Sequence, residues 1–279
     1  MSKFSDKSYV MKYIFLIILV GFLIGCDSND SSEPNLNSEK LITGFSIPDV
    51  TSAINQSSRT ITLTVSNRKD LSSLTPTIVV SSGASINPAS NTAQDFSGGV
   101  SYTVTAEDGT TTQYNIEIKR YYSFTFENHF YEVVTENKNW VEAATFSRNL
   151  GGYLTEINSE NEQSQVFSEL SFNADISFED TLHEFGSSAI WLGANDINTE
   201  GIWVWDGNNN GEGNQFWSGG LDGMPVDGLY NNWGDEPDNF SNQDVLTIVL
   251  ETTQRNIAGQ WNDLDGGNSE LFFVIEYDE

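Results

Sequence analysis

The chain of 279 residues has few basic residues, one cysteine and two histidines. It holds 12 lysine or arginine residues against 40 aspartate or glutamate residues, which gives a formal charge of −28. Such a charge repels nucleic acids and anionic lipids, and it attracts cations. We therefore expect no nucleic-acid partner. We interpret most of the charge as solubility of an exposed protein or adaptation to a salty habitat.

The shortage of cysteine and histidine excludes several kinds of chemistry. Cys26 is the only cysteine, so no disulfide can form within the chain. Neither His129 nor His183 pairs with a nucleophile, and no phosphate-cradling glycine loop is present. We therefore predict that the protein is not an enzyme. A glycosidase that uses two carboxylates is the alternative in so acidic a chain, and product release from a glycan panel would reveal it.

The first 26 residues contain the long apolar run of the chain. Residues 14–20 are apolar, and Leu23-Ile24-Gly25-Cys26 follows. Because the run is too short for a comfortable membrane span, we interpret residues 1–25 as a secretory signal, with Met11 as an alternative start. The ending resembles a bacterial lipobox, which implies cleavage before Cys26 and lipidation of its sulfur. A plain signal peptide, or an anchor helix with an incidental cysteine, is the alternative.

This resemblance implies a bacterial lipoprotein that is anchored to the outer membrane through Cys26 and displayed at the cell surface. Residues 26–40 are polar and acidic, so we expect a flexible tether.

Residues 41–120 have the pattern of an all-β domain. Residues 60–65, 100–104 and 114–118 alternate with period two, and glycine or proline turns separate the runs. About seven short strands in this length predict an immunoglobulin-like β-sandwich. The segment carries no clustered carboxylates, so we expect it to act as a spacer.

Two segments near the C-terminus place side-chain oxygens beside tryptophans, at residues 233–239 and 261–263. Glu236 and Asp238 flank a proline, and a cis bond there would let both side chains turn to the same side. The second segment adds an amide and a carboxylate. Oxygen ligands without nitrogen or sulfur suit a hard cation, calcium before any other.

These two segments belong to a longer series of motifs. The others are Asn139–Ala144, Gly151–Ile157, Trp191–Asp196, Glu200–Trp205 and Phe272–Glu276. In this order and spacing the series resembles the C-type lectin-like domain from about residue 121 to residue 279. The resemblance implies an α+β fold with two helices, mixed and antiparallel sheets and long loops. Capping residues place the helices after Asn139 and after Ser159, and residues 171–188 are expected to form a loop.

The resemblance also implies a calcium site that binds sugar hydroxyls. Its five ligands would be Glu236, Asp238, Gln243, Asn262 and Asp263. Asp238 stands where the mannose-type motif has asparagine, and Gln243 stands where glutamate is usual. The total of three carboxylates and two amides is unchanged, so calcium binding is expected, but no sugar can be named.

Further residues are implied as contacts of the ligand or of a second metal. An auxiliary calcium site would use Asp196, Glu200, Asn239 and Asp244, and the equal alternative is that Glu200 and Asp244 only cap turns. Most tryptophans match core positions. We expect Trp217 and Tyr230 to be the exposed aromatic residues that contact the ligand, together with Glu236, Asp238 and Asn262.

Two binding functions follow. The first is a surface-anchored lectin that binds a glycan or glycoprotein with calcium as its cofactor. The alternative is an adhesin whose lectin-like tip binds a protein partner without calcium. An ice-binding role is also known on this fold, and it would require a flat threonine-rich face that the lectin-like part of the sequence does not show.

Overall fold

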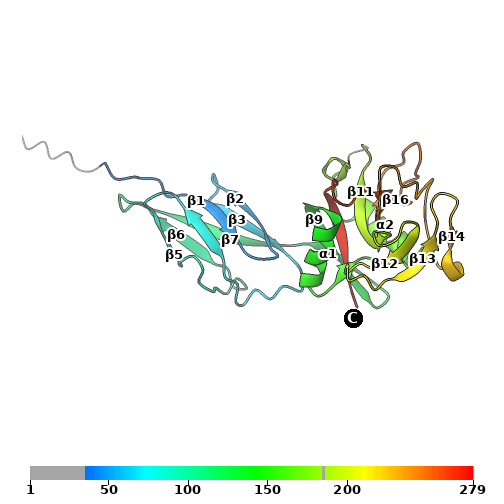
Figure 1. Cartoon of the computed structure of the whole chain (residues 1–279). Coiled ribbons are helices and arrows are strands. Elements are labelled where there is room, and N and C mark those ends of the chain that lie inside the picture. The colour runs from blue at the N-terminus through cyan, green and yellow to red at the C-terminus, as the bar shows by residue number, and fades with distance from the viewer. Residues whose placement is uncertain (1–34, 184–185, 279) are drawn as a thin grey trace, which may run out of the picture. The chain divides into compact units, whose positions relative to one another are not determined.

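The computed structural model describes residues 35–183 and 186–278 (Figure 1). The signal sequence predicted over residues 1–25, the lipidation of Cys26 and part of the tether predicted over residues 26–40 lie outside the described residues. Among the helices that are described, none has the length and apolar character needed to cross a membrane.

The N-terminal part of the described chain consists of strands. They are β1 (Ile42–Ser46), β2 (Thr51–Asn55), β3 (Thr60–Val65), β4 (Thr77–Val80), β5 (Ser85–Asn87), β6 (Ser101–Thr105) and β7 (Thr111–Arg120). β1 pairs with β4, and the other strands form a sheet in the order β2-β3-β7-β6-β5. Ile61, Leu63 and Val65 of β3 are buried in the core of this part, as their period-two spacing predicts. The predicted β-sandwich agrees with these two sheets.

The C-terminal part adds two α-helices, two short 3₁₀ helices and further strands. The helices are α1 (Trp140–Asn149), α2 (Glu160–Phe172), η1 (Phe178–Thr181) and η2 (Val226–Gly228). The strands are β8 (Tyr122–Phe126), β9 (His129–Lys138), β10 (Tyr153–Leu154), β11 (Ala189–Asn195), β12 (Ile202–Trp205), β13 (Asn214–Ser218), β14 (Met224–Pro225), β15 (Val245–Val249), β16 (Trp261–Leu264) and β17 (Leu271–Asp278).

These strands form one mixed sheet. Its main path is β14-β13-β12-β11-β17-β9-β8, and β15 pairs with both β11 and β16. β11 and β17 run parallel, whereas β15 and β16 form an antiparallel pair. Two helices with mixed and antiparallel pairing confirm the fold class that the sequence predicts.

The two α-helices begin where the capping residues predict. The side chain of Asn139 accepts a hydrogen bond from the backbone N–H of Glu142 at 2.9 Å, and that of Ser159 accepts one from Glu162 at 3.2 Å. Each cap satisfies an N–H group that has no partner within its helix. α2 extends to Phe172, so the predicted loop of residues 171–188 begins slightly later and contains η1.

An aromatic cluster supports the strand that carries the second oxygen motif. Trp261 of β16 is fully buried, and its ring meets those of Trp205, Phe216 and Trp233 edge to face. The indole N–H of Trp261 donates to Gln163 of α2 at 2.7 Å. The residues after Trp261 therefore leave a rigid part of the core.

Candidate metal and ligand-binding site

The loop that carries Glu236 and Asp238 is fixed against β16. The backbone N–H of Gly234 donates to the carbonyl of Trp261 at 3.2 Å, and Trp233 forms a bridge with Trp261. A Cβ atom on Gly234 would lie 1.7 Å from Oδ1 of Asn256, so this approach requires glycine. The bond between Glu236 and Pro237 is cis.

Three carboxylates meet at this point. One oxygen from each of Glu236, Asp238 and Asp263 lies within 4.8 Å of the others. Glu236 is 5% exposed and Asp263 is fully buried. Oε2 of Glu236 and Oδ1 of Asp263 receive no hydrogen bond from the N–H and O–H groups of the described residues. Burying such oxygens is costly, so the cluster calls for a shared proton or a bound cation.

Burial and the neighbouring carboxylates also raise the pKa values within the cluster. Burial, followed by the charges of Asp263 and Asp238, raises the pKa of Glu236 to about 8. Burial raises the pKa of Asp263 to about 6, although the backbone N–H of Asn239 donates to it at 3.0 Å. A cation among these groups would reverse both shifts, because it stabilises the charged forms. The oxygen-only donor set fits calcium.

The two amides of the expected ligand set lie at the same place. The side-chain oxygen of Asn262 accepts a hydrogen bond from Nδ2 of Asn256 at 2.8 Å. Nδ2 of Asn262 donates to the carbonyl of Asp263 at 2.7 Å. Gln243 is 5% exposed, and its side chain lines the same cavity as Glu236 and Asp238. The structure thus brings together all five residues that the sequence singles out.

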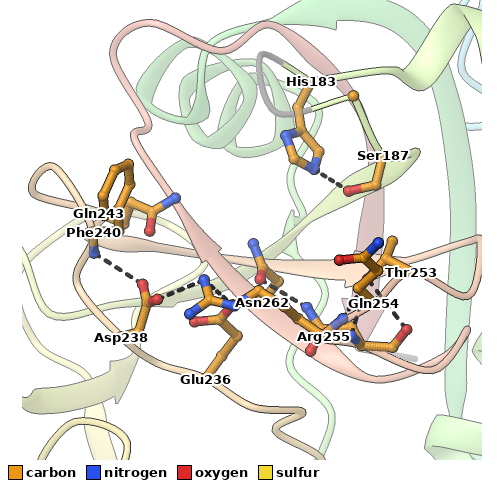
Figure 2. Close-up of a pocket in the computed structure, with 12 residues that line it drawn as sticks. His183, Ser187, Glu236, Asp238, Phe240, Gln243, Thr253, Gln254, Arg255 and Asn262 are labelled. Carbon is orange, nitrogen blue, oxygen red and sulfur yellow. Dashed lines mark hydrogen bonds and ion pairs between the residues drawn. The ribbon is translucent and has the colours of Figure 1, made fainter.

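A cavity of about 550 Å³ opens beside the carboxylates (Figure 2). Sequence reasoning identified four of its lining residues, namely Glu236, Asp238, Gln243 and Asn262. It missed the others, which come from two further loops and from the residues after Asp238: His183, Gly186, Ser187, Phe240, Thr253, Gln254, Arg255 and Asn256. A cavity of this size suits a small ligand.

One signal in the sequence could have identified Arg255. It is the only lysine or arginine after Arg148, in a stretch that is rich in aspartate and glutamate. The structure places its guanidinium 2.6 Å from Oδ2 of Asp238 and 3.5 Å from Oε1 of Glu236. No comparable signal marks Asn256, because asparagine is common in the loops of this chain.

The structure contradicts the expected exposure of Trp217, whereas the ligand contacts of Trp217 and Tyr230 stay predictions. Trp217 is 8% exposed and its indole N–H donates to the carbonyl of Gly219, while the ring of Tyr230 packs on Trp261. Neither lines the cavity. β13 pairs with β12 so that Trp217 lies opposite Trp203, and this register takes it into the core. The exposed aromatic residue at the cavity is Phe240, with 59% of its surface exposed.

Among the described residues, the acids of the expected auxiliary site do not form a close group like that of Glu236, Asp238 and Asp263. Asp196 is 2% exposed, and its Oδ1 has no hydrogen-bond partner among the described residues. Burial raises its pKa to about 7, and Glu200 and Asp244 add to the shift. However, the side-chain oxygen of Asn239 already accepts a hydrogen bond from a neighbouring backbone N–H group, and that of Asp244 accepts one from a neighbouring side-chain amide. Both the metal site and the turn caps stay predictions.

A second buried acidic group lies between β9, β10 and β17. Glu276 is 2% exposed, and its carboxylate accepts from the backbone N–H of Glu156 at 3.0 Å and from the hydroxyl of Tyr153 at 3.2 Å. Nδ1 of His129 lies 2.8 Å from Oε1 of Glu276, the oxygen that accepts from Tyr153. Burial raises the pKa of Glu276 to about 8 and that of Glu156 to about 7.

These raised pKa values predict how stability depends on pH. Each carboxyl binds a proton more readily in the folded than in the unfolded chain, so its contribution is complete below its ordinary pKa of 4.5. It is lost as the pH rises to about 8 for Glu276 and to about 7 for Glu156. We expect the melting temperature in chelator to fall by several degrees between about pH 5 and pH 9. Thermal unfolding at a series of pH values measures it. Glu276→Gln should flatten the curve, and a melting temperature that rises over this range would contradict the prediction.

Comparison with known proteins agrees with this description. Residues 136–273 match the family model of the lectin C-type domain, and residues 42–118 match the model described as SGBP, N-terminal. The C-terminal part of the chain is therefore a C-type lectin-like domain. No curated protein sequence matches the chain.

Several solved structures are similar to the C-terminal part. The carbohydrate-recognition domain of the mouse scavenger receptor C-type lectin is 24% identical, with a TM-score of 0.39 over 56% of this chain and 94% of that one. The cow C-type carbohydrate-recognition domain of CD23 is 20% identical, with a TM-score of 0.37 over 56% and 93%. The C-type lectin CEL-I from Cucumaria echinata is 19% identical, with a TM-score of 0.39 over 56% and 96%.

Proposed function

We propose that the protein is a carbohydrate-binding protein, anchored to the outer bacterial surface through Cys26, that binds a glycan with the help of calcium. Carbohydrate binding in general follows from the lectin C-type and SGBP N-terminal matches. The calcium dependence and the anchor are the parts that we add. No sugar is named, because the combination of Asp238 and Gln243 differs from the mannose-type motif.

One observation carries the proposal. Two buried carboxylate oxygens, Oε2 of Glu236 and Oδ1 of Asp263, have no N–H or O–H partner in the described chain, and Glu236 lines an open cavity. Calcium bound to Glu236, Asp238, Gln243, Asn262 and Asp263 would neutralise them and offer its open coordination positions to sugar hydroxyls. The side chains of Gln243 and Asn262 are then placed to hold the same hydroxyls by hydrogen bonds.

Phe240 supplies an apolar surface at the cavity. Its ring is exposed, and its backbone N–H donates to Oδ1 of Asp238 at 3.0 Å, which links the position of the ring to the carboxylate cluster. The faces of sugar rings carry C–H groups that pack on aromatic rings. Phe240 therefore takes the role that the sequence assigned to Trp217 and Tyr230.

The remaining parts of the chain fit a surface role. A lipid on Cys26, followed by the expected tether of residues 26–40 and the β-sandwich, would present the lectin-like part away from the membrane. A single shallow site binds weakly, and many anchored copies on one cell would raise the avidity for a polymeric glycan.

The calcium-independent adhesin is the second candidate, and Arg255 is the observation that favours it. Its guanidinium already neutralises part of the carboxylate cluster, since it lies 2.6 Å from Asp238. A site whose acids are held by arginine does not require a metal to keep its shape. In this case the cavity would bind its partner equally well in chelator.

A glycan array read with calcium and with chelator distinguishes the two functions. We expect binding in calcium and loss of binding in chelator. Phe240→Ala should weaken binding of the selected glycan about tenfold, because it removes a central contact. Leu221→Ala is the matched control, since Leu221 is also 59% exposed but does not line the cavity. No glycan binding in either buffer would favour the protein-binding adhesin, and equal glycan binding in both buffers would contradict the calcium dependence.

A further inference from the structure

Arg255 occupies an unusual position for a basic residue. It is the only lysine or arginine after Arg148, and it lies in the loop between β15 and β16, next to two of the expected calcium ligands. Figure 2 shows its guanidinium directed at Asp238 and Glu236 on the wall of the cavity. Its side chain is 58% exposed, so no packing forces it to stay there.

The contacts of Asp238 show why this position matters. Oδ1 of Asp238 accepts from the backbone N–H of Phe240 at 3.0 Å, and Oδ2 lies 2.6 Å from Nη1 of Arg255. Both oxygens of the carboxylate therefore have a partner. An oxygen that holds a guanidinium at this distance cannot also ligate a divalent cation without placing two positive groups against each other.

Arg255 covers only the cavity side of the cluster. Its distance to Oε1 of Glu236 is 3.5 Å, whereas within the described chain it forms no ion pair with Oε2 of Glu236 or with the fully buried Asp263. The one positive charge of Arg255 thus faces three carboxylates, and it leaves Oε2 of Glu236 and Oδ1 of Asp263 unpaired in the described chain. A divalent cation could reach both, so it would compensate the cluster more completely than the arginine does.

We propose that Arg255 is the resident counter-ion of the carboxylate cluster, that it must leave Asp238 before calcium binds, and that it thereby sets the calcium concentration at which the site is filled. This inference rests on the calcium site proposed above. The cluster has two alternative partners, and they compete for Oδ2 of Asp238. Competition of this kind raises the apparent dissociation constant of calcium. The increase is larger when the contact between Arg255 and Asp238 is stronger.

The test is a calorimetric titration of calcium into residues 27–279 with Arg255→Gln. Removing the competitor should lower the calcium dissociation constant about tenfold or more. Arg148→Gln is the matched control, because it removes the same charge from a residue of α1 that donates to the carbonyl of Asn208. Arg255→Lys should give an intermediate value, because an ammonium keeps the charge but loses the fork geometry of the guanidinium.

Thermal unfolding in chelator provides a second readout. Arg255→Gln should melt at a lower temperature than the parent chain in chelator, because Asp238 and Glu236 lose their counter-ion, and calcium should raise its melting temperature by more than it raises that of the parent. If Arg255→Gln does not fold, the titration of Arg255→Lys decides the question by the same comparison.

The outcomes separate this inference from the proposed function. If the parent chain binds calcium and Arg255→Gln binds it equally or more weakly, the competition is overturned while the calcium site stands. If neither chain binds calcium, both proposals fail together. If only Arg255→Gln binds calcium, the competition is supported, and the native chain works without calcium as the adhesin does.

Discussion

Calcium binding is expected to weaken about 100-fold or more when Glu236 is changed to glutamine and Asp263 to asparagine. These two residues contribute the buried oxygens that lack N–H and O–H partners in the described chain. The changes keep the size of both side chains and remove two of the three negative charges that a hard cation needs. Calorimetric titration of residues 27–279 measures the effect.

The same double variant separates loss of the site from loss of the fold. Because the carboxylates repel each other and are buried, the neutral amides should leave the melting temperature in chelator equal to that of the parent or higher. Asp235→Asn with Glu212→Gln is the control, since both residues are exposed and the change in charge is the same. A double variant that keeps the parent affinity would show that the cation site is placed wrongly.

Trp261→Ala is expected to lower the free energy of unfolding by about 3–5 kcal/mol. Trp261 has no exposed surface, and its ring centroid lies 5.5 Å from that of Trp205 and 5.9 Å from those of Phe216 and Trp233. The change leaves a cavity in the aromatic cluster and deprives Gln163 of its hydrogen-bond donor. Since domains are stable by about 5–15 kcal/mol, a large share of the stability would be lost.

Urea unfolding followed by circular dichroism measures this loss. Trp261→Phe fills most of the space but cannot donate to Gln163, so it should cost about 1–3 kcal/mol and stays measurable if the alanine variant does not fold. Phe172→Ala, which changes an aromatic residue that is 79% exposed, should alter the stability by about 0.5 kcal/mol or less. Equal costs for Trp261→Ala and Phe172→Ala would contradict the role of the cluster.

The cluster also links stability to the site. Asn262 and Asp263 follow Trp261 directly on β16, and the loop of Gly234 is bonded to the carbonyl of Trp261. A shift of this strand would move the carboxylate of Asp263 relative to Glu236. The tryptophans of the two oxygen motifs therefore belong to the core and hold the oxygens in position.

The local features of the fold could be predicted because they depend on neighbours in the sequence. A cap needs a side chain three residues from the N–H group that it binds, and Asn139 and Ser159 meet that condition. A half-buried strand needs alternation, and β3 has it. Similarly, Glu236 and Asp238 lie on one short loop, and Asn262 and Asp263 are adjacent, so the sequence indicates an oxygen cluster.

Strand register and loop contacts could not be predicted in the same way. Trp217 is buried because β13 pairs with β12 in a register that places it opposite Trp203. His183 reaches the cavity from the loop before β11, and Asn256 reaches it from the loop after β15. None of these contacts follows from spacing, because each joins segments that are distant in the chain.

By itself, the sequence determined the fold class, where the helices begin and the five oxygen-bearing residues expected at the site. Only the tertiary structure decided what surrounds them. It placed Phe240 at the cavity instead of Trp217, and it directed Arg255 onto Asp238. The physical reason is that periodicity and capping act within a few residues, whereas the partner of a buried charge is set by packing between distant loops.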